Sequence, residues 1–125
     1  MKVILVIEDE ALLLAVYRRI LKRDYAVITV SSLEAAEGVI RGDPQIDLIL
    51  SDTSLGDGFS HTLHAKVADL LNERGVTWIA MSGSFEVTSH RPSRDYYLSA
   101  GVMMVDKDDI SPTSLLRLVF WQFVK

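Results

Sequence analysis

The stretch VILVIEDE, residues 3–10, joins five consecutive apolar residues directly to three acidic ones. Its apolar part is continuous rather than alternating, as in strands that are buried on both faces of a parallel sheet. Four more short apolar runs follow along the chain, at residues 26–30, 48–50, 78–81 and 102–105. We therefore predict five buried strands at these positions.

Segments with helical periodicity separate the predicted strands. Apolar residues recur there every three or four positions, which is typical of helices that pack one face on a sheet. The four clearest stripes are Leu12/Leu13, Val16 and Ile20; Leu33, Ala36 and Ile40; Phe59, Leu63, Val67 and Leu70/Leu71; and Leu115, Leu116, Val119 and Phe123.

Local signals indicate where these helices begin and end. Ser31 or Ser32 can cap the second helix, and the sequence Gly42-Asp43-Pro44 ends it. Gly75 follows the third helix, and Ser111-Pro112 begins the last one. For residues 84–101 we predict a loop and then a short helix from about Pro92 to Ser99, because proline does not fit a helix interior.

The alternation of strands and helices predicts an α/β fold. Right-handed βαβ units would build a doubly wound, five-stranded parallel sheet with helices on both faces. A chain of 125 residues fits one such domain, residues 1–125. In these folds ligands bind beyond the carboxyl ends of the strands, which is where the chemistry should lie.

The composition excludes several classes of function. A net charge of −4 argues against direct nucleic-acid binding. The absence of cysteine excludes disulfides, thiolate metal sites and a cysteine nucleophile. No signal peptide is visible, and no apolar stretch approaches the roughly 18 residues that a membrane span needs. We therefore expect a cytoplasmic protein without a membrane partner.

Reactive or polar residues follow four of the five predicted strands. They are Glu8-Asp9 after the first strand, Asp52 after the third, Ser82 after the fourth and Lys107 after the fifth. Clustered carboxylates repel one another unless a cation lies among them, and oxygen ligands suit Mg²⁺. A metal-bound aspartate can attack phosphorus, while a lysine and a serine hydroxyl bind the phosphoryl oxygens. These strand ends predict a site for phosphoryl transfer.

Four motifs carry a resemblance to a known family. They are VILVIEDE, DLILSDTSLGDG, WIAMSGS and AGVMMVDKD, in the family's order and with nearly its spacing. The chain resembles, over almost its whole length, the CheY-like receiver domains of bacterial two-component response regulators, which have a flavodoxin-like fold. The resemblance implies Asp52 as phospho-acceptor, Glu8 and Asp9 as the acidic pair that holds Mg²⁺, the backbone carbonyl of Ser54 as a further metal ligand, Ser82 as the switch hydroxyl and Lys107 as the phosphate-sensing lysine.

The resemblance also implies a function and its partners. A histidine kinase or a phosphotransfer protein would phosphorylate Asp52, and Ser82 and Lys107 would relay the change to a partner surface. Such a phosphorelay domain is not an enzyme in the usual sense. It would catalyse at most its own phosphorylation and slow dephosphorylation.

The chain departs from the family pattern in its output half. Met104 stands where the family commonly has an aromatic switch residue, and Asp108 replaces a usual proline, so we expect no cis bond after Lys107. The turn at residues 55–58 is shortened, and the connection from residue 82 to residue 101 is long. The phosphorylation chemistry is expected to be intact, but the route of switching is expected to differ.

Two other functions fit parts of the pattern. A Mg²⁺-dependent phosphatase of the haloacid dehalogenase type also places a nucleophilic aspartate after a strand, but it needs a second aspartate at the position of Ser54. A degenerate receiver would act only through protein contacts. Single residues also have plainer interpretations: Asp9 as a helix cap, Ser82 as a strand-end hydroxyl, Lys107 as a solvated lysine, and His61 and His64 as solvated histidines rather than a metal pair.

The last helix carries more apolar residues than one face needs. Packing on the sheet accounts for Leu115, Leu116, Val119, Phe120 and Phe123. Leu118 and Trp121, extended by Val124, fall outside that stripe. Either the buried face is wide, or these residues form a partner surface for a homodimer or an output domain.

Overall fold

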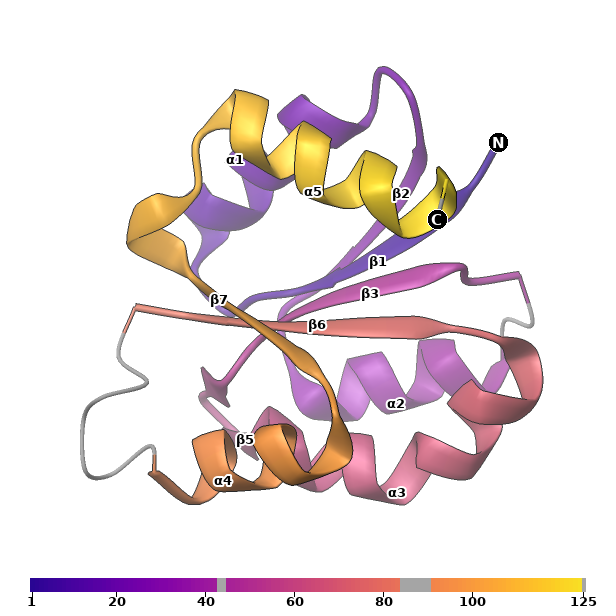
Figure 1. Cartoon of the computed structure of the whole chain (residues 1–125), viewed down its shortest axis with the longest axis vertical. Helices are drawn as coiled ribbons and strands as arrows, with labels where there is room; N and C mark the ends of the chain where they lie inside the picture. Colours follow the sequence, from indigo (N-terminus) through magenta and orange to yellow (C-terminus); the bar gives the residue numbers. More distant parts are fainter. Residues whose placement is uncertain (43–44, 84–90, 125) are drawn as a thin grey trace.

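A parallel sheet of five strands forms the centre of the molecule (Figure 1). The computed structural model describes residues 1–42, 45–83 and 91–124. The strand order is β2-β1-β3-β6-β7. The strands are β1 (Val3–Ile7), β2 (Ala26–Val30), β3 (Leu48–Asp52), β6 (Thr77–Ser82) and β7 (Met103–Asp106). All five lie where the apolar runs predict them.

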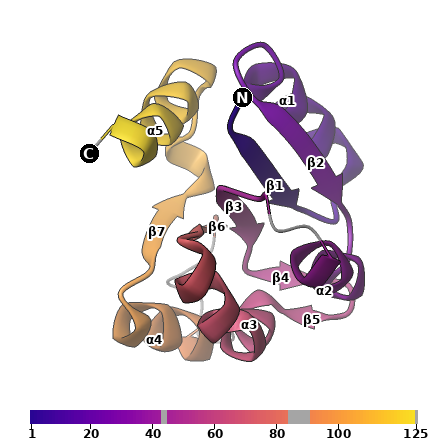
Figure 2. The ribbon, with the colours of Figure 1, turned by 90° about the vertical axis from the view of Figure 1, so that its right-hand side faces the viewer.

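Among the described residues, five α-helices cover the two faces of the sheet. They are α1 (Ala11–Leu21), α2 (Leu33–Gly42), α3 (Ser60–Arg74), α4 (Arg91–Ala100) and α5 (Pro112–Val124). Helices α1 and α5 lie on one face, and α2, α3 and α4 lie on the other (Figures 1 and 2). The strand order reverses between β1 and β3, which is the switch point of a flavodoxin-like fold. The predicted doubly wound α/β fold is confirmed.

The central strands are apolar throughout because both of their faces are buried. In β1, Leu5 and Ile7 face the core that α2, α3 and α4 cover. Ile4 and Val6 face the core under α1 and α5. All four side chains are fully buried, which explains a continuous apolar run in place of an alternating one.

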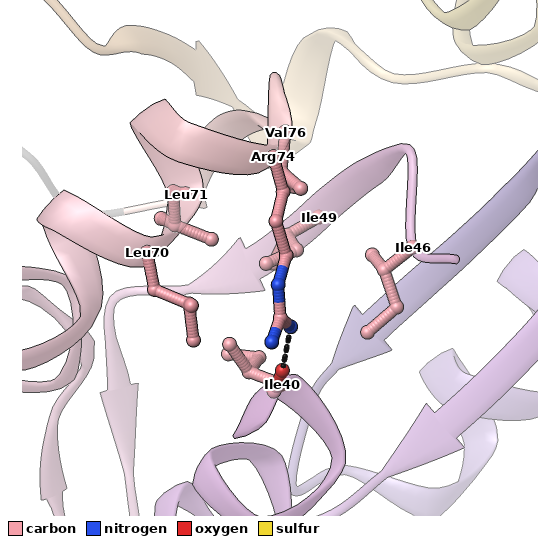
Figure 3. Close-up of a pocket in the computed structure, with 7 residues that line it drawn as sticks. All are labelled: Ile40, Ile46, Ile49, Leu70, Leu71, Arg74 and Val76. Carbon is pink, nitrogen blue, oxygen red and sulfur yellow. Dashed lines mark hydrogen bonds between the residues drawn. The ribbon is translucent and has the colours of Figure 1, made fainter. Parts of the chain in front are cut away.

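Helix α2 is capped at both ends by side chains that lie elsewhere in the sequence. At its start, the Asp57 carboxylate accepts hydrogen bonds from the backbone N–H groups of Leu33 and Glu34. At its end, Arg74 Nη1 donates to the Ile40 carbonyl over 2.7 Å, across a small apolar pocket (Figure 3). The predicted Ser32 cap is also present, since its Oγ accepts from the Ala35 N–H. Positions 43 and 44 of the predicted stop lie outside the described residues.

Other helix ends match the predictions with one exception. Gly75 ends α3 in the left-handed conformation with φ of 67°, as a C-terminal glycine should. Helix α4 begins at Arg91, one residue before the predicted Pro92, and the predicted loop before it falls mainly on residues 84–90, outside the described ranges. The interpretation of Asp9 as a cap is wrong, because the N-cap of α1 is Glu10.

A short hairpin follows β3 and was not predicted as strands. Its arms are β4 (Ser54–Leu55) and β5 (Gly58–Phe59), with the predicted turn at their tip. Phe59 therefore ends β5 as the N-cap of α3, instead of starting that helix's apolar stripe. The hairpin lies between the end of β3 and the start of α3.

The last helix buries a stripe that differs slightly from the predicted one. Leu115 and Val119 are fully buried, and Leu118 packs against the same core. Phe120, predicted to pack, is 55% exposed, like Trp121 at 56% and Val124 at 50%. With about 100° per residue, Leu118 lies closer than Phe120 to the line through Leu115 and Val119.

In the part of the chain that the structure describes, no helix is long and apolar enough to cross a membrane.

Candidate functional site

The predicted site residues gather at one edge of the sheet, where the carboxyl ends of the strands meet. Glu8 directly follows β1, Asp52 is the last residue of β3, Ser82 is the last of β6, and Lys107 directly follows β7. The parallel register aligns these ends, since Asp52 pairs with Met81. The structure thus brings together residues that are up to 99 positions apart in the chain.

Three carboxylates form the acidic part of this site. Glu8, Asp9 and Asp52 each offer an oxygen atom within 4.8 Å of the others. Glu8 is buried, Asp52 is mostly buried and Asp9 is exposed, so the cluster is reached from solvent on the Asp9 side. An all-oxygen set with one exposed member fits a hard cation that keeps several waters, as Mg²⁺ does.

Lys107 follows the edge strand β7, and its side chain contacts the acidic cluster. Its Nζ lies 2.9 Å from Glu8 Oε2 and 3.3 Å from Asp52 Oδ2. Although burial disfavours its charge, the hydrogen bond to Glu8 and the nearby carboxylates raise the pKa of Lys107 above its ordinary value. The interpretation of Lys107 as a solvated lysine is therefore wrong.

The pKa of the Glu8 carboxyl is raised well above its ordinary value. Burial raises its pKa to about 7; the Lys107 hydrogen bond opposes the rise and the Asp52 charge adds to it. The carboxyl can therefore gain or lose a proton near neutral pH. A cation bound among the carboxylates would favour its ionised form.

The Asp52 carboxylate is held by a different contact at each oxygen. The Thr53 backbone N–H donates to Oδ1 over 2.8 Å, and Lys107 lies near Oδ2. The Ser51 hydroxyl donates to the Asp52 backbone carbonyl over 2.8 Å. The contacts of Thr53 and Lys107 fix the direction in which the carboxylate points.

The other predicted residues lie on β6, β4 and β7 and in the turn that follows β7. Ser82 is buried at the end of β6, and half-buried Ser54 begins β4. Met104 is half-buried on β7 and packs against the core under α2, α3 and α4. Asp108 follows Lys107 in a turn where its N–H donates to Asp106. The peptide bond from Lys107 to Asp108 is trans, as predicted.

Sequence reasoning missed two polar contacts between α3 and α4. His64, predicted to be solvated, is buried, and its Nδ1 lies 2.6 Å from the Tyr96 hydroxyl. His61 is half-buried, and its Nδ1 lies 2.8 Å from Ser93 Oγ. The apolar stripes account for the packing of each helix on the sheet, but they do not show which polar residues face a neighbouring helix. The sequence signal for these contacts was therefore weak: polar residues outside the stripes.

No protein-family model matches the chain, and no curated protein sequence matches it. Solved structures do match. A CheY-like response regulator receiver domain from Methanospirillum hungatei is 22% identical with a TM-score of 0.85, over 98% of this chain and 93% of that one. The receiver domain of the hybrid histidine kinase CckA is 26% identical with a TM-score of 0.74, over 96% and 97%.

A third solved structure also has this fold. A response regulator from Burkholderia pseudomallei contains a phosphorylated aspartic acid, a calcium ion and citrate. It is 21% identical to this chain with a TM-score of 0.77, over 93% of this chain and 65% of that one. The predicted resemblance is thus confirmed in the fold, which is that of CheY-like receiver domains over nearly the whole chain. This fold supports a signalling domain that is switched by phosphorylation.

Proposed function

We propose that residues 1–125 form a single receiver domain of a two-component phosphorelay, in which Asp52 accepts a phosphoryl group. The observation that carries this proposal is the placement of the Asp52 carboxylate between an acidic pair and a lysine, with Lys107 Nζ 3.3 Å from Asp52 Oδ2. The acidic pair and the lysine together are what phosphoryl transfer to an aspartate requires.

The donor would be a phosphohistidine on a histidine kinase or a phosphotransfer protein, acting in the cytoplasm. A carboxylate oxygen of Asp52 attacks the phosphorus atom, and the phosphorus–nitrogen bond breaks. The imidazole leaves with the electron pair of that bond and takes a proton from water. The product is an acyl phosphate on Asp52.

Each neighbouring residue has a task in this transfer. Glu8, Asp9 and Asp52, with the Ser54 carbonyl, would hold Mg²⁺, which when bound offsets negative charge on the transferred group. Lys107 is already charged and in place to bind a phosphoryl oxygen. The Ser82 hydroxyl would donate to another oxygen after transfer.

Two observations weigh against the alternative functions. A phosphatase of the haloacid dehalogenase type would need a carboxylic acid two residues after Asp52, and the hydroxyl of Ser54 is a poor general acid at neutral pH. A degenerate receiver would have lost part of this residue set, whereas Glu8, Asp9, Asp52 and Lys107 are all present together. We therefore expect a switch that does not turn over continuously.

Incubation with acetyl phosphate and Mg²⁺, followed by intact-protein mass spectrometry, tests the proposal. We expect one phosphoryl group per chain, no labelling of Asp52→Asn and no labelling without a divalent cation. Asp24→Asn, at an exposed aspartate outside the site, is the matched control and should label fully. Continuous phosphate release would favour the phosphatase. No mass gain in the wild type would favour the contact module.

A further inference from the structure

Side-chain hydrogen bonds hold α4 against α3. Ser60 Oγ lies 2.6 Å from the Tyr97 hydroxyl, next to the contacts of His61 with Ser93 and of His64 with Tyr96. Bonds between two side chains are a minority of the hydrogen bonds in proteins, yet three of them join this one pair of helices. The position of α4 relative to α3 is therefore set by directional polar contacts as well as by apolar packing.

The Ser60–Tyr97 bond is the most deeply buried of the three. Both residues are 0% exposed, so water has no access to either hydroxyl. Separating the two residues would break this buried hydrogen bond, which is unfavourable. Burial also raises the pKa of Tyr97, so the phenol stays protonated and able to donate. When Ser60 moves, Tyr97 is therefore constrained to move with it.

Ser60 is in turn connected to Asp52 through the base of the β4–β5 hairpin. The Thr53 N–H donates to Asp52 Oδ1 over 2.8 Å. The Thr53 carbonyl accepts from the Ser60 N–H over 3.0 Å. A continuous series of hydrogen bonds thus runs from the Asp52 carboxylate to α4, and every residue between its ends is fully buried.

No comparable hydroxyl is available on β7, where an aromatic residue was expected. Met104 has no O–H group, and its sulfur is at best a weak acceptor. Its side chain packs against the same core cluster that contains Tyr97. The fully buried aromatic hydroxyl that is linked to Asp52 therefore lies on α4.

We propose that Tyr97, through its hydrogen bond to Ser60, couples the phosphorylation state of Asp52 to the position of α4. The inference rests on the proposed phosphorylation of Asp52. Phosphorylation converts a carboxylate oxygen into part of an acyl phosphate and adds negative charge beside it, which changes the acceptor that the Thr53 N–H faces. Thr53 and Ser60 then shift, and Tyr97 transmits the shift to the helix.

Amide hydrogen exchange in the full chain tests this coupling, with Mg²⁺ and beryllofluoride as the phosphoryl mimic. In the wild type we expect exchange in residues 91–100 to change by about fivefold or more, the lower end of common coupling. Tyr97→Phe keeps the ring but removes the hydroxyl, and Ser60→Ala removes the bond from the other side. Both variants should bind beryllofluoride within about twofold of the wild type, since neither residue belongs to the site. Both should lose most of the α4 response.

Two comparisons separate coupling from a merely structural role. The double variant Ser60→Ala/Tyr97→Phe should lose no more of the response than either single variant, because one bond is removed in all three. Tyr96→Phe removes the neighbouring hydroxyl, which bonds His64 instead of Ser60, and should keep the wild-type response. A structural role would change α4 exchange equally with and without beryllofluoride.

The outcomes distinguish this inference from the proposed function. If the wild type binds beryllofluoride and α4 responds equally in Tyr97→Phe and Ser60→Ala, the role of Tyr97 is refuted and the receiver function stands. If the wild type binds beryllofluoride but α4 shows no response, the role of Tyr97 is likewise refuted and the receiver function stands. If the wild type binds no beryllofluoride in the presence of Mg²⁺, the proposed function fails and this inference fails with it.

Discussion

Lys107 donates a hydrogen bond of 2.9 Å to Glu8 across 99 residues of the chain. The two residues follow strands β7 and β1, which are separated in the sheet by β3 and β6. The Lys107 side chain therefore extends along the carboxyl edge of the sheet toward Glu8. Its Nζ also lies 3.3 Å from Asp52 Oδ2. This ion pair gives the buried Glu8 carboxylate a partner, and under the proposed function it also positions the lysine for a phosphoryl group.

Removing the lysine should destabilise the fold in a pH-dependent way. Lys107→Ala leaves Glu8 buried without its cationic partner and should lower the free energy of unfolding by about 3 kcal/mol at pH 8. The Lys107 hydrogen bond lowers the pKa of Glu8, so its loss raises that pKa further above the unfolded value. The folded variant then holds a proton that the unfolded chain releases, so its stability falls as pH rises from about 4.5 through the folded pKa. The penalty should be smaller at pH 5.5.

Urea unfolding in metal-free buffer at both pH values measures this effect. Lys66→Ala is the matched control, because Lys66 is an exposed lysine whose Nζ lies 3.8 Å from Glu37 on the surface. It should change stability by less than about 0.5 kcal/mol at either pH. A Lys107→Ala penalty that is the same at pH 5.5 and pH 8 would contradict the assigned role of the Glu8 charge.

The place of the site could be predicted from the sequence because parallel strands share one direction. Once Asp9, Asp52 and Lys107 follow apolar runs, the topology alone brings them to the same edge of the sheet. The contacts of Asp57 with α2 and of Tyr97 with Ser60 could not be predicted in this way. They join residues 24 and 37 positions apart, and they depend on how helices sit on the sheet and on which rotamers fit.

The prediction exchanged Phe120 and Leu118 on α5, and this error has a similar origin. Periodicity shows that one face of a helix is buried, but it does not locate the centre of that face to within one residue. Phe120 and Leu118 lie on opposite borders of the stripe, so a small rotation exchanges them. The packing of α5 against α1 and the sheet decides in favour of Leu118.

Mg²⁺ binding should depend on Asp9 and not on the acidic residue beside it. Asp9→Ala removes one oxygen ligand and one compensating charge, and should weaken Mg²⁺ binding about tenfold, or 1.4 kcal/mol. Glu10→Ala removes the adjacent exposed carboxylate, which lies outside the cluster, and should leave the affinity within about twofold. Titration followed by the fluorescence of Trp78 and Trp121 measures both. Equal affinities in the two variants would place the metal elsewhere.

The Asp57 cap should stabilise α2 from the hairpin that follows Asp52. Asp57→Ala removes the acceptor for the Leu33 and Glu34 N–H groups and should cost about 1 kcal/mol of stability. These bonds lower the pKa of Asp57, so the stabilisation is present above its unfolded pKa and is lost as pH falls through the folded value. Asp57→Asn keeps an acceptor oxygen and should lose less at pH 7. Urea unfolding of the two variants at pH 7 and pH 3 checks this order, and equal losses at pH 7 would exclude the capping role.

The exposed apolar residues of α5 should support association of the domain with a second copy of itself. Trp121 is 56% exposed and lies near Val124, also half exposed, on the side of α5 away from the core. Tryptophan is enriched among interface hot spots, so Trp121→Ala should weaken a homodimer by about 2 kcal/mol or more. Leu12→Ala, at an exposed apolar residue of α1, is the matched control and should dimerise like the wild type. Sedimentation of all three proteins at several concentrations, with and without beryllofluoride, decides the matter. A wild type that remains monomeric at the highest concentrations in both states would contradict a homodimer through α5.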